Sequence, residues 1–308
     1  MLLAASGCQR ARPPADTLVV AQVAEPRSLD PHVTTALNDF RILVNVFEGL
    51  VGYRPGTLEP APALAESWSV SDDGRVYTFR LRPRVRFHDG SAFDAEAVRF
   101  NFQRMLDPNH PNHDTGPFPL AFFFDEVETV EVVDPLTVRF RLKDPFAPFL
   151  SNLAYPAGLM VSPAAVRRWE RDVGRHPSGT GAFRFVDWRP GERVRLERFS
   201  DYRGAGEGAP AAAAATPVEH LIFRPITDPM TRVAELLAGG PVPAAFDWAH
   251  DPDLKPYGHD QEAARALLAD AGLADAVELT LLVPRGGSGV RYQDAAGISR
   301  GSPRESRV

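Results

Sequence analysis

The residue types that could carry out chemistry occur in two short histidine-containing stretches. His88, Asp89 and Gly90 place an imidazole beside a carboxylate, the pairing that general acid–base catalysis uses. A β-turn with an exposed imidazole accounts for the same residues, because Asp-Gly is a common turn sequence, and we favour that interpretation. His110 and His113 have a spacing typical of metal ligands, but their loop is rich in Pro and Asn and offers no convincing further ligand. We therefore expect a surface loop and no metal.

Two glycine-rich stretches could be taken for phosphate cradles. The sequence GTG at residues 179–181 lacks the Lys-Ser/Thr of a P-loop and leads into a strand, and GGSG at 286–289 is typical of a flexible turn. No serine has the setting of a nucleophile elbow, and Cys8 is the single cysteine. We expect no cofactor and no enzyme. A hydrolase that uses His88 and Asp89 with a recruited water stays open as an alternative.

Composition limits the remaining classes of protein. A chain of 308 residues is long enough for one large or two medium domains. Its net charge of −6 argues against nucleic acid or an anionic membrane as the main partner. No stretch approaches the roughly 20 apolar residues of a membrane span.

The single cysteine follows small residues near the N-terminus, in LLAASGC, and precedes the polar, proline-rich tether QRARPPAD. This pattern resembles a bacterial lipobox, in which the cysteine is lipidated. Only seven residues precede Cys8, too few for a complete signal peptide, and Ala5 stands where Leu is commoner. We expect Cys8 to be a lipidation site, with the true start codon upstream. The alternative is an accidental cysteine in a disordered leader.

Hydrophobic periodicity predicts strands and helices in irregular alternation, with hairpins between them. This arrangement indicates an α/β fold with added antiparallel ribbon. The predicted elements are a strand at 17–23, a helix along 40–50 capped by Asn38 or Asp39, a helix from the cap Asp94 to Met105, a hairpin at 127–142, a short helix after Ser162, a hairpin at 182–199, a surface loop at 204–217, a strand at 220–226 and a helix capped by Asp228.

A paired ribbon is expected at residues 68–93. Tyr77, Phe79 and Leu81 alternate with polar residues, and Val85 and Phe87 repeat the alternation before a turn at Asp89-Gly90. The later run of three phenylalanines at 122–124 is expected to lie in the core.

The ribbon and its flanks, LAESWSVSDDGRVYTFRLRPRVRFHDGSAFDAEAVRFNFQR at residues 64–104, resemble the family 5 extracellular solute-binding proteins of bacterial ABC importers. Three further stretches match this family in the same order: SLDPH, HPSGTGAFRF and LIFRPITDPMTRVAELLAGG. The similarity runs from about residue 17 to residue 240.

The resemblance implies an α/β fold: a lobe like that of the type 2 periplasmic-binding proteins, with an additional α+β domain. In this family two lobes close over a di- or oligopeptide, or a similar small solute, for delivery to ABC transporter permease subunits. It implies a periplasmic or cell-surface protein that meets the membrane only through a lipid anchor at Cys8.

The chain departs from the family after residue 240, where it continues with a stretch that resembles a later portion of the family. An internal segment is therefore expected to be absent near 240–243, which leaves the second lobe largely absent. The expected divisions are a leader and tether (1–16), an initial stretch of the first lobe (17–49), the additional domain (50–165), the remaining stretch of the first lobe (166–240), a remnant of the second lobe (241–290) and an out-of-frame or disordered tail (291–308).

On this scheme the surviving wall of the binding site follows the first strand, with a second candidate in a tryptophan-containing loop. The candidate contact residues are Glu25, Pro26, Ser28, Leu29, Thr34, Thr35, Asn38 and Trp248. Pro26 and Leu29 could instead turn and pack the chain, and Trp248 could fill a gap between domains. A surface scaffold that binds no solute, or the product of a decaying gene, is the alternative function.

Overall fold

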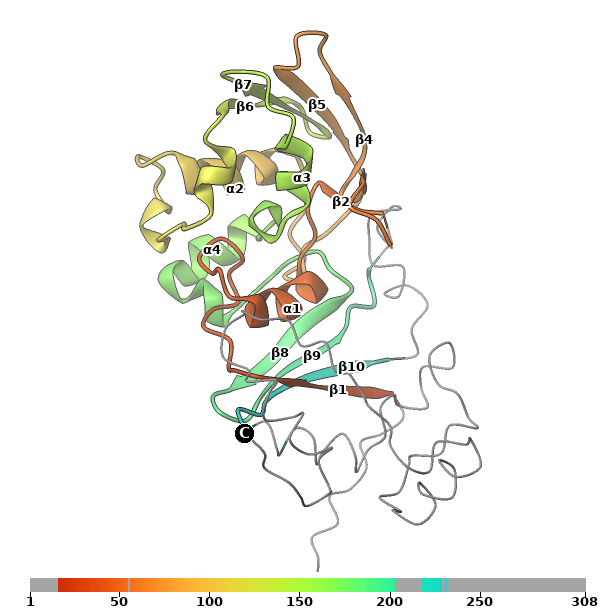
Figure 1. Ribbon diagram of the computed structural model, residues 1–308, viewed down its shortest axis with the longest axis vertical. Coiled ribbons are helices and arrows are strands. Elements are labelled where there is room, and N and C mark those ends of the chain that lie inside the picture. The colour runs from red at the N-terminus through yellow and green to blue at the C-terminus, as the bar shows by residue number, and fades with distance from the viewer. Residues whose placement is uncertain (1–15, 55, 203–217, 229–230, 232–308) are drawn as a thin grey trace, which may run out of the picture. The chain divides into compact units, whose positions relative to one another are not determined.

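The computed structural model describes residues 16–54, 56–202, 218–228 and 231 (Figure 1). Up to Asp228 these residues belong to one compact unit. Some sequence-based predictions therefore fall outside the described residues. They concern Cys8, the loop at 204–217, the helix after Asp228, Trp248, the GGSG turn, the gap near 240–243 and the C-terminal tail.

The first sheet contains four strands in the order β1-β10-β9-β8. Its strands are β1 (Thr17–Gln22), β8 (Phe183–Arg189), β9 (Arg193–Arg198) and β10 (His220–Pro225). β1 and β10 are parallel and the other pairs are antiparallel, so the sheet is mixed. Among the described strands β1 lies at the edge, and most of its residues are only half-buried rather than enclosed.

The second sheet is wholly antiparallel, in the order β4-β5-β7-β6. Its strands are β4 (Ala65–Val70), β5 (Val76–Leu81), β6 (Val127–Asp134) and β7 (Thr137–Leu142). One face packs against α2 (Ala95–Leu106), and edge-to-face aromatic pairs fill the layer between them. Phe140 contacts Phe79, Phe102 and Phe149 with ring centroids 5.6, 4.8 and 5.4 Å apart.

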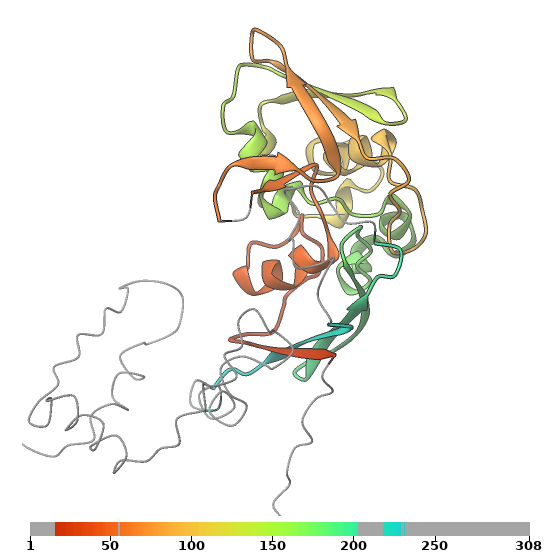
Figure 2. The ribbon, with the colours of Figure 1, turned by 90° about the vertical axis from the view of Figure 1, so that its right-hand side faces the viewer.

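Short elements lie between the strands of these two four-stranded sheets. They are α1 (Leu37–Val46), β2 (Val51–Tyr53), β3 (Pro60–Pro62), η1 (His113–Thr115), η2 (Ala121–Phe124), α3 (Phe149–Ala154), η3 (Pro156–Gly158), α4 (Pro163–Trp169) and η4 (Glu170–Arg175). Two of them, β2 and β3, pair in a small antiparallel sheet of their own. Figures 1 and 2 show α1 beside the first sheet, on the side that faces the second.

Local capping explains where two of the predicted helices begin. The Asp94 side chain accepts a hydrogen bond from the Ala97 amide at 2.9 Å, and α2 starts at the next residue. Ser162 accepts from the Ala165 amide at 3.2 Å, and Pro163 occupies the first position of α4. Both predictions are confirmed.

The predicted start of the first helix is wrong. Ala36 is the N-cap of α1 and provides no side-chain cap, while Asn38 and Asp39 lie inside the first turn. The Asp39 carboxylate instead accepts hydrogen bonds from the Thr34 hydroxyl at 2.5 Å and the Arg27 amide at 3.2 Å, so it organises the preceding loop.

The predicted ribbon is only partly correct. β5 pairs with β4 and β7, but the expected second strand at Val85 and Phe87 is reduced to a single bridge between Arg86 and Ala92. Positive φ angles at Arg84 (61°) and Gly90 (85°) bend this segment away from a strand path.

Candidate functional site

The bent segment docks the second sheet onto the start of β8. The amide of His88 donates to the Gly179 carbonyl at 2.8 Å, and its Nε2 lies 2.8 Å from the Gly181 carbonyl. Its Nδ1 accepts from the Gly179 amide at 3.4 Å, so both ring nitrogens are engaged. Burial lowers the pKa of His88 to about 4. The turn prediction holds, but the expected exposure of the imidazole is wrong.

The carboxylate beside this histidine also has structural partners. Asp89 Oδ2 accepts from the Ser162 hydroxyl, and Oδ1 accepts from the Ser91 amide and hydroxyl. Burial raises the pKa of Asp89, but these hydrogen bonds outweigh it and the net pKa is lowered. His88 and Asp89 therefore point their polar atoms at neighbouring chain segments, which leaves the hydrolase hypothesis without a support in the geometry.

The two histidines with metal-like spacing contact different residues. His110 packs its ring edge against Phe100 at 4.8 Å, while His113 Nδ1 contacts the Arg104 carbonyl at 2.9 Å. Within the described ranges no group of three or more His, Cys, Asp or Glu side chains could hold a metal ion. The same part of the chain has no helix that is long and apolar enough to cross a bilayer.

Most predicted contact residues in the loop after β1 have partners within the protein. Both carboxylate oxygens of Glu25 accept hydrogen bonds, one from Trp188 Nε1 at 2.9 Å and one from the Gly191 amide at 3.0 Å. Pro26 is buried. These contacts tie the loop to the β8–β9 hairpin.

The next residues of this loop differ in how far their side chains are exposed. Leu29 is buried and donates its amide to the Gly174 carbonyl at 2.9 Å, while Ser28 accepts from the Asp30 amide at 3.1 Å. Thr34 is buried as well, but Thr35 is exposed and Asn38 is half-buried. Of the predicted residues that the structure describes, Thr35 is exposed and Glu25, Ser28 and Asn38 are half-buried; Thr35 and Asn38 lie at the start of α1.

Apolar side chains extend from this point over α1, Tyr155 and η2, of which Leu37, Tyr155 and Phe122 are exposed, Phe123 is half-buried and Phe40 is buried. Leu37 on α1 is 66% exposed, Phe40 packs edge-on against Tyr155 at 5.8 Å, and Tyr155 in turn contacts Phe123 at 5.2 Å. Phe123 lies 4.5 Å from Phe122, which is 58% exposed. We call Leu37, Phe40, Tyr155, Phe123 and Phe122 the aromatic strip.

Sequence reasoning missed the aromatic strip. The prediction that the phenylalanine run lies in the core is confirmed for Phe124, which is 1% exposed, and is wrong for Phe122. The run forms the 3₁₀ helix η2, whose three-residue turn cannot place three consecutive side chains on one face.

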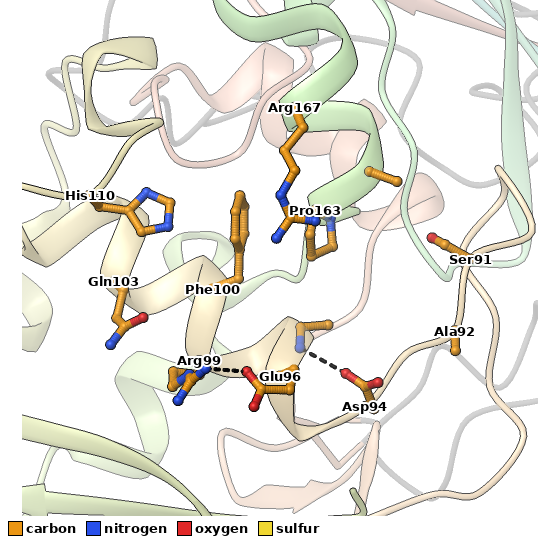
Figure 3. A pocket seen from close by; sticks show the side chains of 12 residues that line it. Ser91, Ala92, Asp94, Glu96, Arg99, Phe100, Gln103, His110, Pro163 and Arg167 are labelled. Carbon is orange, nitrogen blue, oxygen red and sulfur yellow. Dashed lines mark hydrogen bonds and ion pairs between the residues drawn. The ribbon is translucent and has the colours of Figure 1, made fainter.

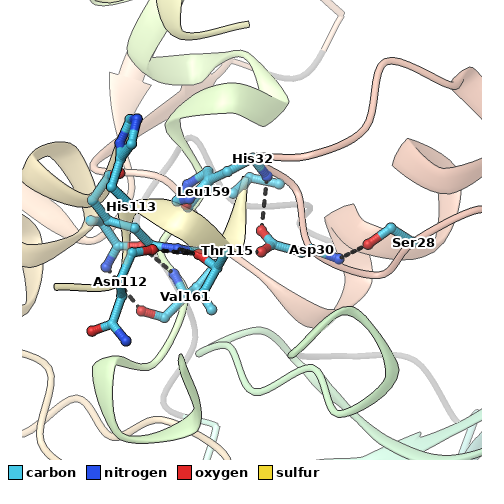
Figure 4. A network of polar contacts seen from close by, with 10 residues as sticks. Ser28, Asp30, His32, Asn112, His113, Thr115, Leu159 and Val161 are labelled. Carbon is cyan, nitrogen blue, oxygen red and sulfur yellow. Dashed lines mark hydrogen bonds and ion pairs between the residues drawn. The ribbon is translucent and has the colours of Figure 1, made fainter. Parts of the chain in front are cut away.

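A buried polar network joins the loop before α1 to α2 and to the segment after Tyr155 (Figure 4). Arg104 on α2 is fully buried, and its Nη2 lies 2.5 Å from Asp30 Oδ2 while its Nε donates to Thr115 at 2.8 Å. Burial raises the pKa of Asp30, but attraction to Arg104, with His32 and their hydrogen bonds, lowers the net pKa. His32 Nε2 contacts the Leu159 carbonyl at 2.8 Å, and burial lowers its pKa to about 4.

This network reaches two parts of the chain that carry residues of the strip. Asp30 and His32 precede Thr35 and α1, and Leu159 follows Tyr155 closely in the chain. Asn101 of α2 also exchanges hydrogen bonds of 2.9 Å in both directions with the backbone of Val161. The loop before α1 and the segment after Tyr155 are therefore both held by α2.

A second ionisable group is buried just after α1. Glu48 is 9% exposed, and its Oε1 accepts a hydrogen bond from the Tyr202 hydroxyl at 3.1 Å. Burial raises the pKa of Glu48 to about 7 against the lowering effect of its hydrogen bonds and of Arg82.

Comparison with known proteins identifies the group to which the chain belongs. Residues 59–241 match the family model described as bacterial extracellular solute-binding proteins, family 5 middle. A glutathione-binding protein of Pectobacterium atrosepticum is 36% identical over 221 residues, which are 72% of this chain and 40% of the relative. The di/tripeptide-binding protein 2 of Pseudomonas aeruginosa is 39% identical over 253 residues, 77% of this chain and 46% of the relative.

Solved structures agree with the sequence comparisons. A dipeptide-binding protein from Pseudoalteromonas sp. SM9913 in complex with Met-Leu matches with a TM-score of 0.65 and 28% identity, covering 72% of this chain and 45% of that one. NikZ from Campylobacter jejuni in complex with Ni(L-His) matches with a TM-score of 0.62 and 28% identity, covering 73% and 42%. The α/β fold of a periplasmic-binding-protein lobe is confirmed.

The chain spans less than half the length of these relatives. The family model matches the second sheet and the strands β8, β9 and β10 of the first, while β1, α1 and the loop between them precede the matched region. The chain is a member of the bacterial extracellular solute-binding proteins, family 5.

Proposed function

We propose that the chain supplies one wall of an extracytoplasmic site that captures a di- or oligopeptide for an ABC importer. The observation that carries this proposal is the aromatic strip beside Thr35 and Asn38. Exposed apolar surface that continues over several elements is typical of a binding surface. An extended peptide uses such a surface for its side chains and nearby polar groups for its main chain.

The relatives support a peptide as the solute class. Their names describe binding of glutathione and of di- and tripeptides, and one solved relative holds Met-Leu. A small metal complex is the second solute class, because NikZ holds Ni(L-His).

In this proposal Thr35 and Asn38 contact the solute directly, together with Leu37 and Tyr155. Glu25, Pro26, Ser28, Leu29 and Thr34 shape the loop that presents them. Trp248 stays a predicted contact outside the described residues. The same proposal includes permease subunits of an ABC transporter as the partner, a lipid anchor at Cys8 and a periplasmic or cell-surface location. It also includes the division into a first lobe (17–49 and 166–240) and an additional domain (50–165).

Isothermal titration of the full chain with Met-Leu and with glutathione tests the proposal. We expect saturable binding of at least one of the two peptides, and we expect Tyr155→Ala to weaken it at least fivefold. Val133→Ala is the matched control, because Val133 is a 48% exposed apolar side chain on β6, a strand that contributes no residue to the strip. Equal loss of affinity in both variants would count against the strip.

The scaffold alternative predicts a different result for the same protein in a thermal denaturation experiment. It predicts a cooperative thermal melt whose midpoint no peptide shifts, because a scaffold that binds no solute gains no stability from ligand.

A further inference from the structure

A polar cavity of about 370 Å³ lies between α2 and α4, on elements that contribute nothing to the aromatic strip (Figure 3). Phe100 of α2 and Pro163 of α4 lie on its walls, with Arg99, Gln103, His110 and Arg167 around them. Figure 3 shows Phe100 between the imidazole of His110 and the guanidinium of Arg167.

The two arginines of the cavity differ in how their charges are balanced. Arg99 Nη2 lies 2.5 Å from Glu96 Oε2, one turn away on the same helix, so its charge is paired. Arg167 stacks its guanidinium 4.7 Å from the centroid of the Phe100 ring and, within the described residues, makes no ion pair. Stacking fixes the plane of the guanidinium while its edge N–H groups stay available to a ligand.

The lining also includes two carboxylates, Asp94 and Glu96, of which Asp94 accepts from the Ala97 amide as the cap of α2 and Glu96 pairs with Arg99. His110 and Gln103 add hydrogen-bond donors. His110 Nδ1 accepts from the Asn112 amide at 3.2 Å, so the neutral imidazole carries its proton on Nε2. Gln103 brings a side-chain amide from the next turn of α2. An unpaired guanidinium, an N–H imidazole and an amide together match the acceptor oxygens of a carboxylate.

We propose that this cavity is a subsite for a small carboxylate-bearing molecule, with Arg167 as its principal contact and His110 and Gln103 as secondary donors. The cavity is large enough for a carboxylate with a few further heavy atoms. Because the site is open to solvent, we expect a dissociation constant on the order of 1 mM. The proposal goes beyond peptide capture and stands or falls independently of it.

The test is an NMR titration of the uniformly ¹⁵N-labelled full chain with N-acetylglycine, a carboxylate that lacks an ammonium group. N-acetylglycinamide is the matched probe of similar shape without the charge. The variant is Arg167→Gln. The control is Arg168→Gln, because Arg168 is the next residue of α4 but stacks over Trp169 at 4.8 Å, outside the cavity.

We expect saturable shifts of the Gln103 side-chain amide with N-acetylglycine and none with the amide. Affinity should fall at least fivefold in Arg167→Gln and stay unchanged in Arg168→Gln. Absence of saturable shifts, an equal response to the uncharged probe, or equal affinities in the two variants would overturn the proposal. Shifts confined to the aromatic strip would overturn it too. If Arg167→Gln does not fold, Gln103→Leu replaces it, with the backbone amide of Arg167 as the reporter in both wild type and variant, and should also weaken binding.

Discussion

Removal of the buried carboxylate of Asp30 should destabilise the protein strongly. In Asp30→Ala the guanidinium of Arg104 loses its partner at 2.5 Å while it remains 0% exposed. Breaking a buried ion pair from one side typically costs about 3–5 kcal/mol, because the remaining charge is left without compensation in a region of low dielectric constant. Arg104 keeps its hydrogen bond to Thr115, so we expect a loss of about 3 kcal/mol in the free energy of unfolding.

Two further variants separate this cost from ordinary surface effects. Asp144→Ala removes the partner of Arg75, at 2.9 Å, from a pair whose side chains are 73% and 47% exposed, and it should cost less than about 1 kcal/mol. The double variant Asp30→Ala, Arg104→Met should recover some of the loss from Asp30→Ala, because it leaves no buried charge.

Urea denaturation at pH 7 measures the free energy of unfolding of all three variants. The pKa of Asp30 is lowered in the folded state, so its stabilisation is present above the unfolded pKa near 4 and is lost as the pH falls through the folded pKa. The difference between wild type and Asp30→Ala should therefore shrink in acid. Equal costs for Asp30→Ala and Asp144→Ala, or no recovery in the double variant, would refute the reasoning.

Four other substitutions have defined outcomes. Because the folded pKa of Glu48 is raised to about 7 from 4.5, the stability of the wild type relative to Glu48→Gln should fall by about 3 kcal/mol as the pH rises across that window, as measured by urea titrations of both proteins; the contributions of His32 and His88 are common to both and cancel in this difference. Gly179→Ala would force a Cβ against the Val46 carbonyl oxygen, well inside van der Waals contact, and should prevent stable folding by circular dichroism. Gly191→Ala, with open space around its Cβ and φ of 72°, should cost only about 1–2 kcal/mol. Asp94→Ala should lower the free energy of unfolding by about 1 kcal/mol through loss of the α2 cap, as measured by urea denaturation.

Local chemistry explains which regions of the fold could be predicted. The caps at Asp94 and Ser162 and the turn at Asp134 act within four residues of themselves, so residue type and spacing were sufficient. Asp39 follows the same local rule for a cap, yet the side chain of Thr34 and the amide of Arg27 engage its carboxylate inside the helix. Contacts with the preceding loop are therefore the reason why Asp39 does not cap α1.

The candidate site was harder to predict from the sequence, because it depends on contacts between residues that are far apart in the chain. Thr35 and Asn38 were predicted from a family resemblance, and their surface position fits a role in binding, which stays a prediction. Tyr155 was not predicted, because its place beside Phe40 depends on hydrogen bonds from His32 and Asn101 to the backbone that follows it. No periodicity in the sequence around Tyr155 indicates that contact.

Photo-crosslinking tests the central claim, that the aromatic strip contacts the solute, most directly. The full chain is irradiated with a Met-Leu analogue that carries a diazirine on its leucine side chain, and the adducts are located by mass spectrometry. The account predicts adducts at Leu37, Tyr155 or Phe122 that unlabelled Met-Leu suppresses in a concentration-dependent way. Adducts that Met-Leu does not suppress, or suppressible adducts confined to residues outside the strip and its neighbours Thr35 and Asn38, would contradict it.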